Sequence, residues 1–179
     1  MEFGRRSAPG GQRGMMRAAL VVAAVGMLGV ACAPQGVVAD ARTVDMCTIL
    51  TDAELSKLGV RPDTRETVDQ FGSVGCEWVG KPVRFSLERD KVTVASYRTR
   101  PRGPSFITFT ENAVNGRAGL TFAVDRDGGT DCEQLMDGGS VSLVVHVAST
   151  LSPDGHRIDS CPEALRIAQL IEPRLPRAS

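Results

Sequence analysis

Aromatic residues are scarce in this 179-residue chain, and it has no excess of positive charge. Aromatic residues make up 4% of it, with one Trp and one Tyr, and 21 Lys and Arg are balanced by 21 Asp and Glu. Proteins that bind nucleic acid use a basic stripe together with aromatic side chains that stack on bases. Because the chain shows neither feature, we expect no nucleic acid among its partners.

Metal-binding motifs are also lacking. None of the five cysteines stands in a Cys-x-x-Cys pair and there are only two histidines, so the clustered ligands of a zinc site are absent. Asp125, Asp127 and Asp131 are spaced similarly to a calcium loop, but no bidentate Glu follows and Gly129 stands where another Asp is expected. We therefore expect solvated carboxylates in a turn, with no metal and no other cofactor.

No motif for nucleophilic catalysis is present in the sequence. The Gly-x-Ser-x-Gly elbow is missing, and Gly138-Gly139-Ser140 is typical of a hairpin turn. His146 lies in a β-branched run, where we expect it on a solvated face or hydrogen-bonded rather than catalytic, and His156 lies in a loop. Carboxylates that are distant in sequence can still act together in hydrolysis. An envelope hydrolase or modifying enzyme with dispersed residues is therefore one alternative function.

The marked apolar run of the chain is too short to cross a bilayer as a helix, which takes about 20 residues. Residues 18–30 carry no charge and follow Arg5, Arg6, Arg13 and Arg17. A positive segment before a short apolar segment is typical of a cleaved signal peptide. Translation can start at any of three methionines, Met1, Met15 or Met16, and the choice does not change this interpretation.

The apolar run ends in Leu28-Gly29-Val30-Ala31-Cys32, which resembles a bacterial lipobox. The resemblance implies that Cys32 becomes the new N-terminus and carries a diacylglyceryl group. Two acyl chains, such as palmitate, give stable anchoring where one gives only marginal binding. The alternative is an ordinary signal peptide cut near Ala31, with no role for Cys32.

Four cysteines remain after Cys32 is assigned to lipid. An even number favours two disulfides in an oxidising compartment, and four cysteines allow three pairings. We favour Cys47 with Cys76 and Cys132 with Cys161, because each pair joins positions that flank one local unit.

The chain length favours one domain after the leader. We expect a lipoprotein signal peptide over residues 1–31, a lipidated cysteine and flexible tether over 32–44, and a single extracytoplasmic domain over 45–179.

Helix signals stand at both ends of this domain. Thr51 and Glu54 have the spacing of a capping box and Gly59 is a suitable terminator, which predicts a short helix. Ser160 and Glu163 have the same spacing and predict a C-terminal helix. Its apolar face is predicted to consist of Ala164, Ile167, Ala168, Ile171 and Leu175.

Short runs of alternating or β-branched residues between the helices predict strands. Trp78 shares one face of its run with Cys76, and we expect both in the core. We expect residues 98–104 to be an exposed basic loop that is solvated or contacts a phosphate or partner. The strands are predicted at 75–79, 83–88, 92–95, 106–109, 120–124, 132–136 and 141–147, with 92–95 pairing with 83–88 and the last two forming a hairpin. This order predicts an α+β domain with an antiparallel sheet of about five to seven strands, a short N-terminal helix and a C-terminal helix.

Several short motifs follow the lipobox-like sequence in order. They are Cys47-Thr-Ile-Leu-Thr, Cys76-Glu-Trp78, Asp131-Cys132, Cys161-Pro-Glu-Ala-Leu-Arg-Ile-Ala and Arg174-Leu175-Pro176. Together they resemble an actinobacterial cell-envelope lipoprotein family that is defined only as a domain of unknown function, over residues 45–176. The resemblance implies a surface location and a small disulfide-bearing α+β module, and it implies no reaction.

The sequence thus favours a non-enzymatic lipoprotein held at the cell membrane through lipid on Cys32, facing the extracytoplasmic side. We expect it to bind an envelope protein or a small ligand. Besides the enzyme alternative, carriage of a lipid is a further possibility, which requires a roomy apolar cavity.

Overall fold

The computed structural model describes residues 40–81, 83–126, 129–149, 154–156 and 158–177. Residues 35–179 form one compact unit that contains every described helix and strand, so this stretch has what it needs to fold independently. Within the described part of the chain, no helix has the length and apolarity needed to span a membrane.

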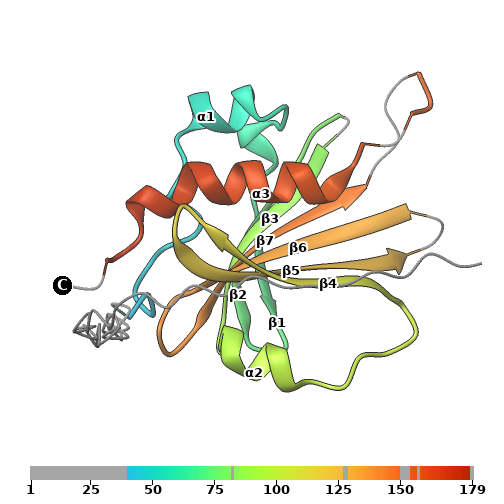
Figure 1. Ribbon diagram of the computed structural model, residues 1–179. Coiled ribbons are helices and arrows are strands. Elements are labelled where there is room, and N and C mark those ends of the chain that lie inside the picture. The colour runs from blue at the N-terminus through green and yellow to red at the C-terminus, as the bar shows by residue number, and fades with distance from the viewer. Residues whose placement is uncertain (1–39, 82, 127–128, 150–153, 157, 178–179) are drawn as a thin grey trace, which may run out of the picture. The chain divides into compact units, whose positions relative to one another are not determined.

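Seven antiparallel strands form a single sheet in the order β1-β2-β3-β7-β6-β5-β4 (Figure 1). They are β1 (Glu66–Gln70), β2 (Ser73–Val79), β3 (Val83–Asp90), β4 (Phe106–Val114), β5 (Arg117–Arg126), β6 (Gly129–Asp137) and β7 (Ser142–Ser149). The predicted α+β class with an antiparallel sheet and two terminal helices is confirmed. The sequence did not predict β1, because Val68 is its only apolar residue and gives no alternating pattern.

The strand predicted at 92–95 is wrong, since a short helix, α2 (Val94–Thr99), begins there. The side chain of Thr93 caps this helix by accepting a hydrogen bond from the backbone N–H of Ser96. Both edges of β3 are already paired, with β2 on one side and β7 on the other. A hairpin partner for β3 therefore has no free edge to pair with.

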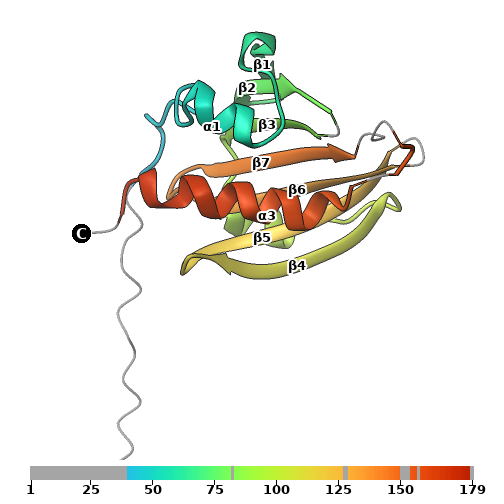
Figure 2. The ribbon, with the colours of Figure 1, turned by 90° about the horizontal axis from the view of Figure 1, so that it is seen from above.

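Two helices, α1 (Asp52–Lys57) and α3 (Ser160–Ile171), lie on one side of the sheet, which we call the covered face. Figures 1 and 2 show both on this side, with α3 lengthwise against β6 and β7. Trp78 is fully buried here as predicted, with its ring 5.5 Å from that of Phe85. The predicted apolar positions of α3 and the turn after it are all buried: Ala164, Ile167, Ala168, Ile171 and Leu175.

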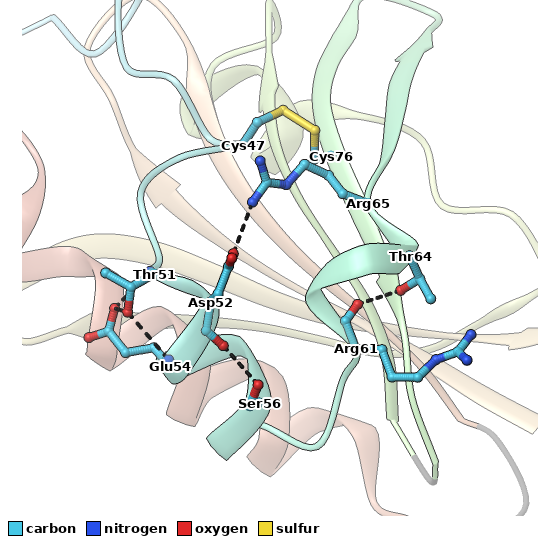
Figure 3. A network of polar contacts seen from close by, with 9 residues as sticks. All are labelled: Cys47, Thr51, Asp52, Glu54, Ser56, Arg61, Thr64, Arg65 and Cys76. Atoms are coloured by element: carbon cyan, nitrogen blue, oxygen red, sulfur yellow. Dashed lines mark hydrogen bonds and ion pairs between the residues drawn. A yellow bond between two sulfur atoms is a disulfide. The ribbon is translucent and has the colours of Figure 1, made fainter.

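The predicted capping box of α1 is present. Thr51 caps the helix by accepting a hydrogen bond from the Glu54 backbone N–H, and the Glu54 carboxylate accepts one from the Thr51 backbone in return (Figure 3). Hydrogen bonding from Arg174, which follows α3, lowers the pKa of Glu54 to about 2, with a further contribution from the Thr51 hydrogen bonds. This pair ties α1 to the C-terminal end of the domain.

The segment after α1 returns the chain to the sheet. Gly59 ends the helix with a φ of +84°, which glycine adopts without strain. The short 3₁₀ turn η1 (Pro62–Thr64) follows, and Figure 3 shows Arg65 beyond it reaching back to Asp52, with 3.3 Å between nitrogen and oxygen. The entry to β1 is thereby fixed against α1.

The C-terminal helix begins one residue earlier than the sequence predicted. Asp159, and not Ser160, is its N-cap, because the Asp159 carboxylate accepts a hydrogen bond from the Cys161 N–H. The Ser160 hydroxyl instead donates to the carbonyl of Thr130 at 2.5 Å. The helix passes into a second 3₁₀ turn, η2 (Glu172–Arg174).

Two disulfides cross-link the domain. They join Cys47 to Cys76 and Cys132 to Cys161, with a sequence separation of 29 in each pair. The first ties the segment before α1 to β2, as Figure 3 shows, and the second ties β6 to α3. Both bonds therefore attach flanking segments to the covered face.

The connection from β3 to β4 has to pass β7, β6 and β5, because β4 is at the far edge of the sheet. It does so on the side opposite α1 and α3, where Figure 1 shows α2. We call this side the open face, since α2 and the following segment cover only part of it. Val94 of α2 packs there on a second apolar cluster with Leu120, Phe122, Val124, Leu135 and Val144.

Candidate functional site

One row of side chains crosses the open face from edge to edge. The strand register aligns Glu77 of β2 with Ser86 of β3, His146 of β7 and Glu133 of β6. The same row continues to Phe122 of β5 and Phe109 of β4. Directly paired residues point to the same face, so the row changes from charged and polar at one end to aromatic at the other.

The charged end of the row lies in a cavity of about 590 Å³ that we call the polar basin. Arg84 donates to Glu77 at 2.6 Å, and the Ser86 hydroxyl donates to Glu88 at 2.5 Å. His146 Nε2 lies 3.5 Å from Asp131 Oδ2. The basin is thus built from acid–base pairs between adjacent strands and an acid–hydroxyl pair within β3.

His146 is held toward its charged form. Burial by itself lowers the pKa of the imidazole, but contact with Asp131 and the charges of Glu133, Asp131 and Glu88 raise it by more. The net pKa lies above the ordinary value, so the imidazolium is favoured at a higher pH than in a free chain. The carboxylates of the basin therefore favour the imidazolium over the neutral ring.

The basin also brings together Ser86, His146 and Asp131, which are the residue types of a hydrolytic triad. Ser86 donates its hydroxyl proton to Glu88 and not to the imidazole, so His146 is not placed to activate it. β3 and β7 are paired on both edges, so their backbone N–H groups serve the sheet and offer no oxyanion hole. Ser86 and His146 therefore do not form the hydrogen-bonded nucleophile–base pair that acyl transfer requires.

The aromatic end of the row lies in a second cavity, of about 410 Å³, which we call the aromatic cleft. Phe122 is at its centre, with ring centroids at 5.9 Å from Tyr97, 5.4 Å from Phe106 and 6.2 Å from Phe109. Such distances are those of favourable aromatic pairs. Six of the chain's aromatic residues are phenylalanines, and three of them gather here with the single tyrosine.

Two arginines from the segment after α2 lie over these rings. The guanidinium carbon of Arg100 is 4.4 Å from the centroid of Tyr97, and that of Arg102 is 3.9 Å from the centroid of Phe109. Both arginines are exposed and both line the cleft. The mouth of the cleft is therefore positively charged.

Tyr97, Arg100 and Glu133 line both cavities, so the polar basin and the aromatic cleft adjoin. The Tyr97 hydroxyl donates to Asp90 Oδ2 at 2.5 Å. Burial and the hydrogen bond to Asp90 raise the pKa of Tyr97, so its hydroxyl remains protonated. This bond fixes the tyrosine at the boundary between the two cavities.

The structure separates several residues that the sequence singled out. Asp131 pairs with Val124 and Asp125 pairs with Thr130, so alternation directs the two carboxylates to opposite faces. Asp127 lies outside the described residues. Within the described ranges, no group of three or more His, Cys, Asp or Glu side chains is arranged to hold a metal ion.

The other residues that the sequence singled out lie apart from the two cavities or outside the described residues, except in the basic segment. Ser140 donates to Asp40 beside the β6–β7 hairpin, and His156 is exposed. Residues 98–104 are exposed as predicted, although α2 extends to Thr99. Cys32 lies outside the described residues.

Sequence reasoning did not identify Tyr97, Glu133 or the three phenylalanines as parts of a site. The alternation in β3 and β7 marked one polar face, but the register that aligns seven strands depends on pairings far apart in sequence. The basic segment was the available signal, since it placed Arg100 and Arg102 in an exposed loop that is solvated or contacts a phosphate or partner.

Comparison with known proteins adds one match. No curated protein and no solved structure matches the chain. The model of a family described as a protein of unknown function (DUF3558) matches residues 31–174. Because this match covers most of the chain, the protein belongs to the DUF3558 family of proteins of unknown function.

Proposed function

We propose that this protein is an actinobacterial cell-envelope lipoprotein that is anchored by lipid on Cys32 and binds a ligand or partner on its open face without catalysing a reaction. The observation that carries the binding role is the pair of adjoining cavities on the open face. The aromatic cleft and the polar basin each fall within the range of small-molecule sites, about 300–1,000 Å³.

The position of these cavities supports binding as their role. The covered face holds the larger core and both disulfides, so the domain has its main stabilising contacts on the other side of the sheet. Charged side chains on a sheet face do not serve a core, and Tyr97, Phe106 and Phe109 stay partly exposed although they pack on the second apolar cluster. A binding surface explains why both occur together.

The anchor is supported by sequence and by cysteine use. The chain has five cysteines, and four of them form the two disulfides. Cys32 alone is left for modification, and it ends the lipobox-like sequence. The proposed orientation places the domain on the extracytoplasmic side of the membrane.

Metabolic labelling with an alkyne-modified palmitate tests the anchor. We expect label on the wild-type chain, none on Cys32→Ser, and an intact mass that begins at Cys32 and includes a diacylglyceryl group. Since the other four cysteines are in disulfides, label on the chain reports on lipid attached at Cys32. An uncut leader, or label that persists in Cys32→Ser, contradicts the anchor.

Co-purification tests the binding surface. Soluble Gln35–Ser179 is immobilised, exposed to a detergent-free envelope extract, and the bound material is identified by mass spectrometry. Glu133→Arg reverses a charge that lines both cavities, whereas Arg166→Ala removes an exposed side chain on α3. We expect a component that binds the wild type and Arg166→Ala but not Glu133→Arg. Binding that is equal for all three, or absent from all three, counts against the proposal.

A further inference from the structure

We infer that the aromatic cleft binds a single-chain anionic lipid, with its chain on the aromatic rings and its carboxylate or phosphate held by Arg100 and Arg102. The inference rests on the proposed function, because it assigns a ligand class to one of the two cavities of the open face. It adds an orientation for that ligand, which the proposed function leaves open.

The floor of the cleft is suited to an apolar chain. Phe122 and Val124 are 5% and 9% exposed, while Tyr97, Phe106 and Phe109 are half-buried around them. Each aromatic ring that is covered contributes about 25 cal/mol for every Å² of apolar surface removed from water. An apolar chain lying across these rings gains this term without needing any hydrogen bond.

The mouth of the cleft is suited to an anion. Among the described residues, neither Arg100 nor Arg102 forms an ion pair, whereas nearby Arg98 pairs with Glu111 at 3.2 Å. Each guanidinium lies on an aromatic ring, which holds it in place while leaving its N–H groups to donate at the edge. Two such forks can hold a carboxylate or phosphate by charge-assisted hydrogen bonds.

An acidic group of the cleft sets the direction of the ligand. Glu133 pairs with Phe122 and lines the cleft where it adjoins the polar basin, and its carboxylate repels an anionic head group. The head is therefore excluded from this end of the cleft and is directed to the mouth under the two arginines. A cationic amphiphile, by contrast, meets the two arginines as it enters.

The lipid, rather than an acidic peptide, is the occupant that these surfaces favour. The apolar part of the lining consists of side chains that do not hydrogen-bond to the backbone of a bound peptide, so they suit an alkyl chain better. The volume of about 410 Å³ is that of a small-molecule site. A domain tethered at a membrane surface, as proposed, is also exposed to such lipids at high local concentration.

Isothermal titration calorimetry on Gln35–Ser179 tests the ligand class with three probes. Dodecanoate has both the chain and the anionic head, dodecyltrimethylammonium has the chain with a cationic head, and acetate has the head without the chain. All are used below their micelle concentrations. We expect one dodecanoate per chain, and affinities for the other two that are weaker by roughly tenfold or more. Dodecyltrimethylammonium loses the charge-assisted hydrogen bonds to the two arginines, and acetate loses the burial of the apolar chain.

Variants assign the two ends of the ligand. Arg100→Ala with Arg102→Ala is expected to weaken dodecanoate binding by roughly tenfold or more, and Arg61→Ala, an exposed arginine outside the cleft, to leave it unchanged. Arg100→Lys with Arg102→Lys keeps the charge without the planar fork and is expected to fall between them. Because Arg100 and Arg102 are exposed, these changes leave the core intact, which circular dichroism checks.

The outcomes separate the ligand class from the binding role. Equal binding of dodecanoate and dodecyltrimethylammonium, binding unaffected by the double alanine variant, or no binding of any probe overturns the inference. If Glu133→Arg still abolishes co-purification in that case, the open face binds something else and the proposed function stands. If co-purification is also insensitive to Glu133→Arg, both fail.

Discussion

The two faces of the sheet use the same strands for different purposes. On the covered face, α1 and α3 cover a buried apolar core, and two disulfides attach the flanking segments. On the open face, the same strands present acid–base pairs and partly exposed rings, with only α2 and one loop above them. Alternation along each strand makes this division possible, because neighbouring residues face opposite sides.

The difference indicates how stability and function are distributed in this fold. On the covered face, the side chain of Gln134 is fully buried, and its amide is hydrogen-bonded to Asn112, Thr121 and backbone carbonyls. Gln134 is thus enclosed and satisfied, whereas the indole N–H of Trp78, also buried on this face, has no hydrogen-bond partner among the described residues. On the open face, Arg100 and Arg102 are exposed and the rings around them are partly exposed, so substitutions there should affect binding more than folding.

The largest loss of stability is expected from breaking a buried ion pair at the end of the covered face. Arg117 Nε lies 3.1 Å from Glu172, and the two side chains are 6% and 8% exposed. Arg117 also donates to the carbonyls of Asp137 and Pro176. Arg117→Met leaves a buried carboxylate unpaired, which typically costs about 3–5 kcal/mol. Urea denaturation of Gln35–Ser179 measures it.

The control for this prediction is a surface pair. Arg166 and Glu163 interact across one turn of α3, with the Arg166 side chain 54% exposed, so Arg166→Ala should change the free energy of unfolding by less than about 1 kcal/mol. The double variant Arg117→Met/Glu172→Leu removes both buried charges and should recover much of the loss. A loss for Arg117→Met no larger than that of Arg166→Ala would show that the pair is not buried as described.

The next largest loss is expected from the disulfide between β6 and α3. Replacing Cys132 and Cys161 together by alanine releases a loop with a separation of 29 residues, which should lower the free energy of unfolding by about 3–4 kcal/mol. The midpoint of thermal unfolding measures the change, with the reduced wild-type chain as a reference for loss of both bonds. An unchanged midpoint would mean that this bond does not hold the covered face together.

These contrasts also explain which parts of the molecule could be predicted from sequence. The capping box at Thr51 and the apolar face of α3 depend on residues close together in the chain, and the favoured cysteine pairing was inferred from positions that flank one local unit. The structure contains all three. α2 was mistaken for a strand because Val92-Thr93-Val94 has β propensity, while the lack of a free edge on β3 is a tertiary fact.

The open face could be predicted only in part for the same reason. Phe106, Phe109 and Phe122 were visible in predicted strands, but their meeting with Tyr97 depends on the path of the β3–β4 connection across the sheet. His146 was expected on a solvated face or hydrogen-bonded, and the register of three strands brings the carboxylates around it.

A smaller, pH-dependent effect is expected for His146. Its pKa is raised in the folded state, so the interactions of the imidazolium stabilise the fold fully below the pKa of the unfolded chain and are lost as pH rises through the folded value. The stability lost in His146→Ala should therefore be greater at acidic than at alkaline pH. NMR titration gives the pKa directly, with His156→Ala to assign the other histidine. A difference that does not vary with pH would contradict the raised pKa.

The smallest expected effect is a gain in stability at the tip of the β1–β2 hairpin. Gln70 pairs with Ser73, so Phe71 and Gly72 form a two-residue turn, with φ values of +53° and +96°. Such turns favour Asn-Gly, because a left-handed conformation costs most residues about 1–2 kcal/mol. Phe71 is 98% exposed and has little packing to lose. Phe71→Asn should therefore raise the free energy of unfolding by about 1 kcal/mol.

The control is Gln70→Asn, a neighbouring exposed change that leaves the turn residues intact and should not stabilise. If Phe71→Asn does stabilise, an exposed aromatic ring is being held in a strained position at the rim of the polar basin, which Phe71 lines. Loss of co-purification in the same variant would then place Phe71 in the binding surface, and the open face would hold a residue that favours binding at the expense of stability. If Phe71→Asn is instead less stable than the wild type, the Phe71 ring makes stabilising contacts despite its 98% exposure. The contrast between the two faces is then weaker than described.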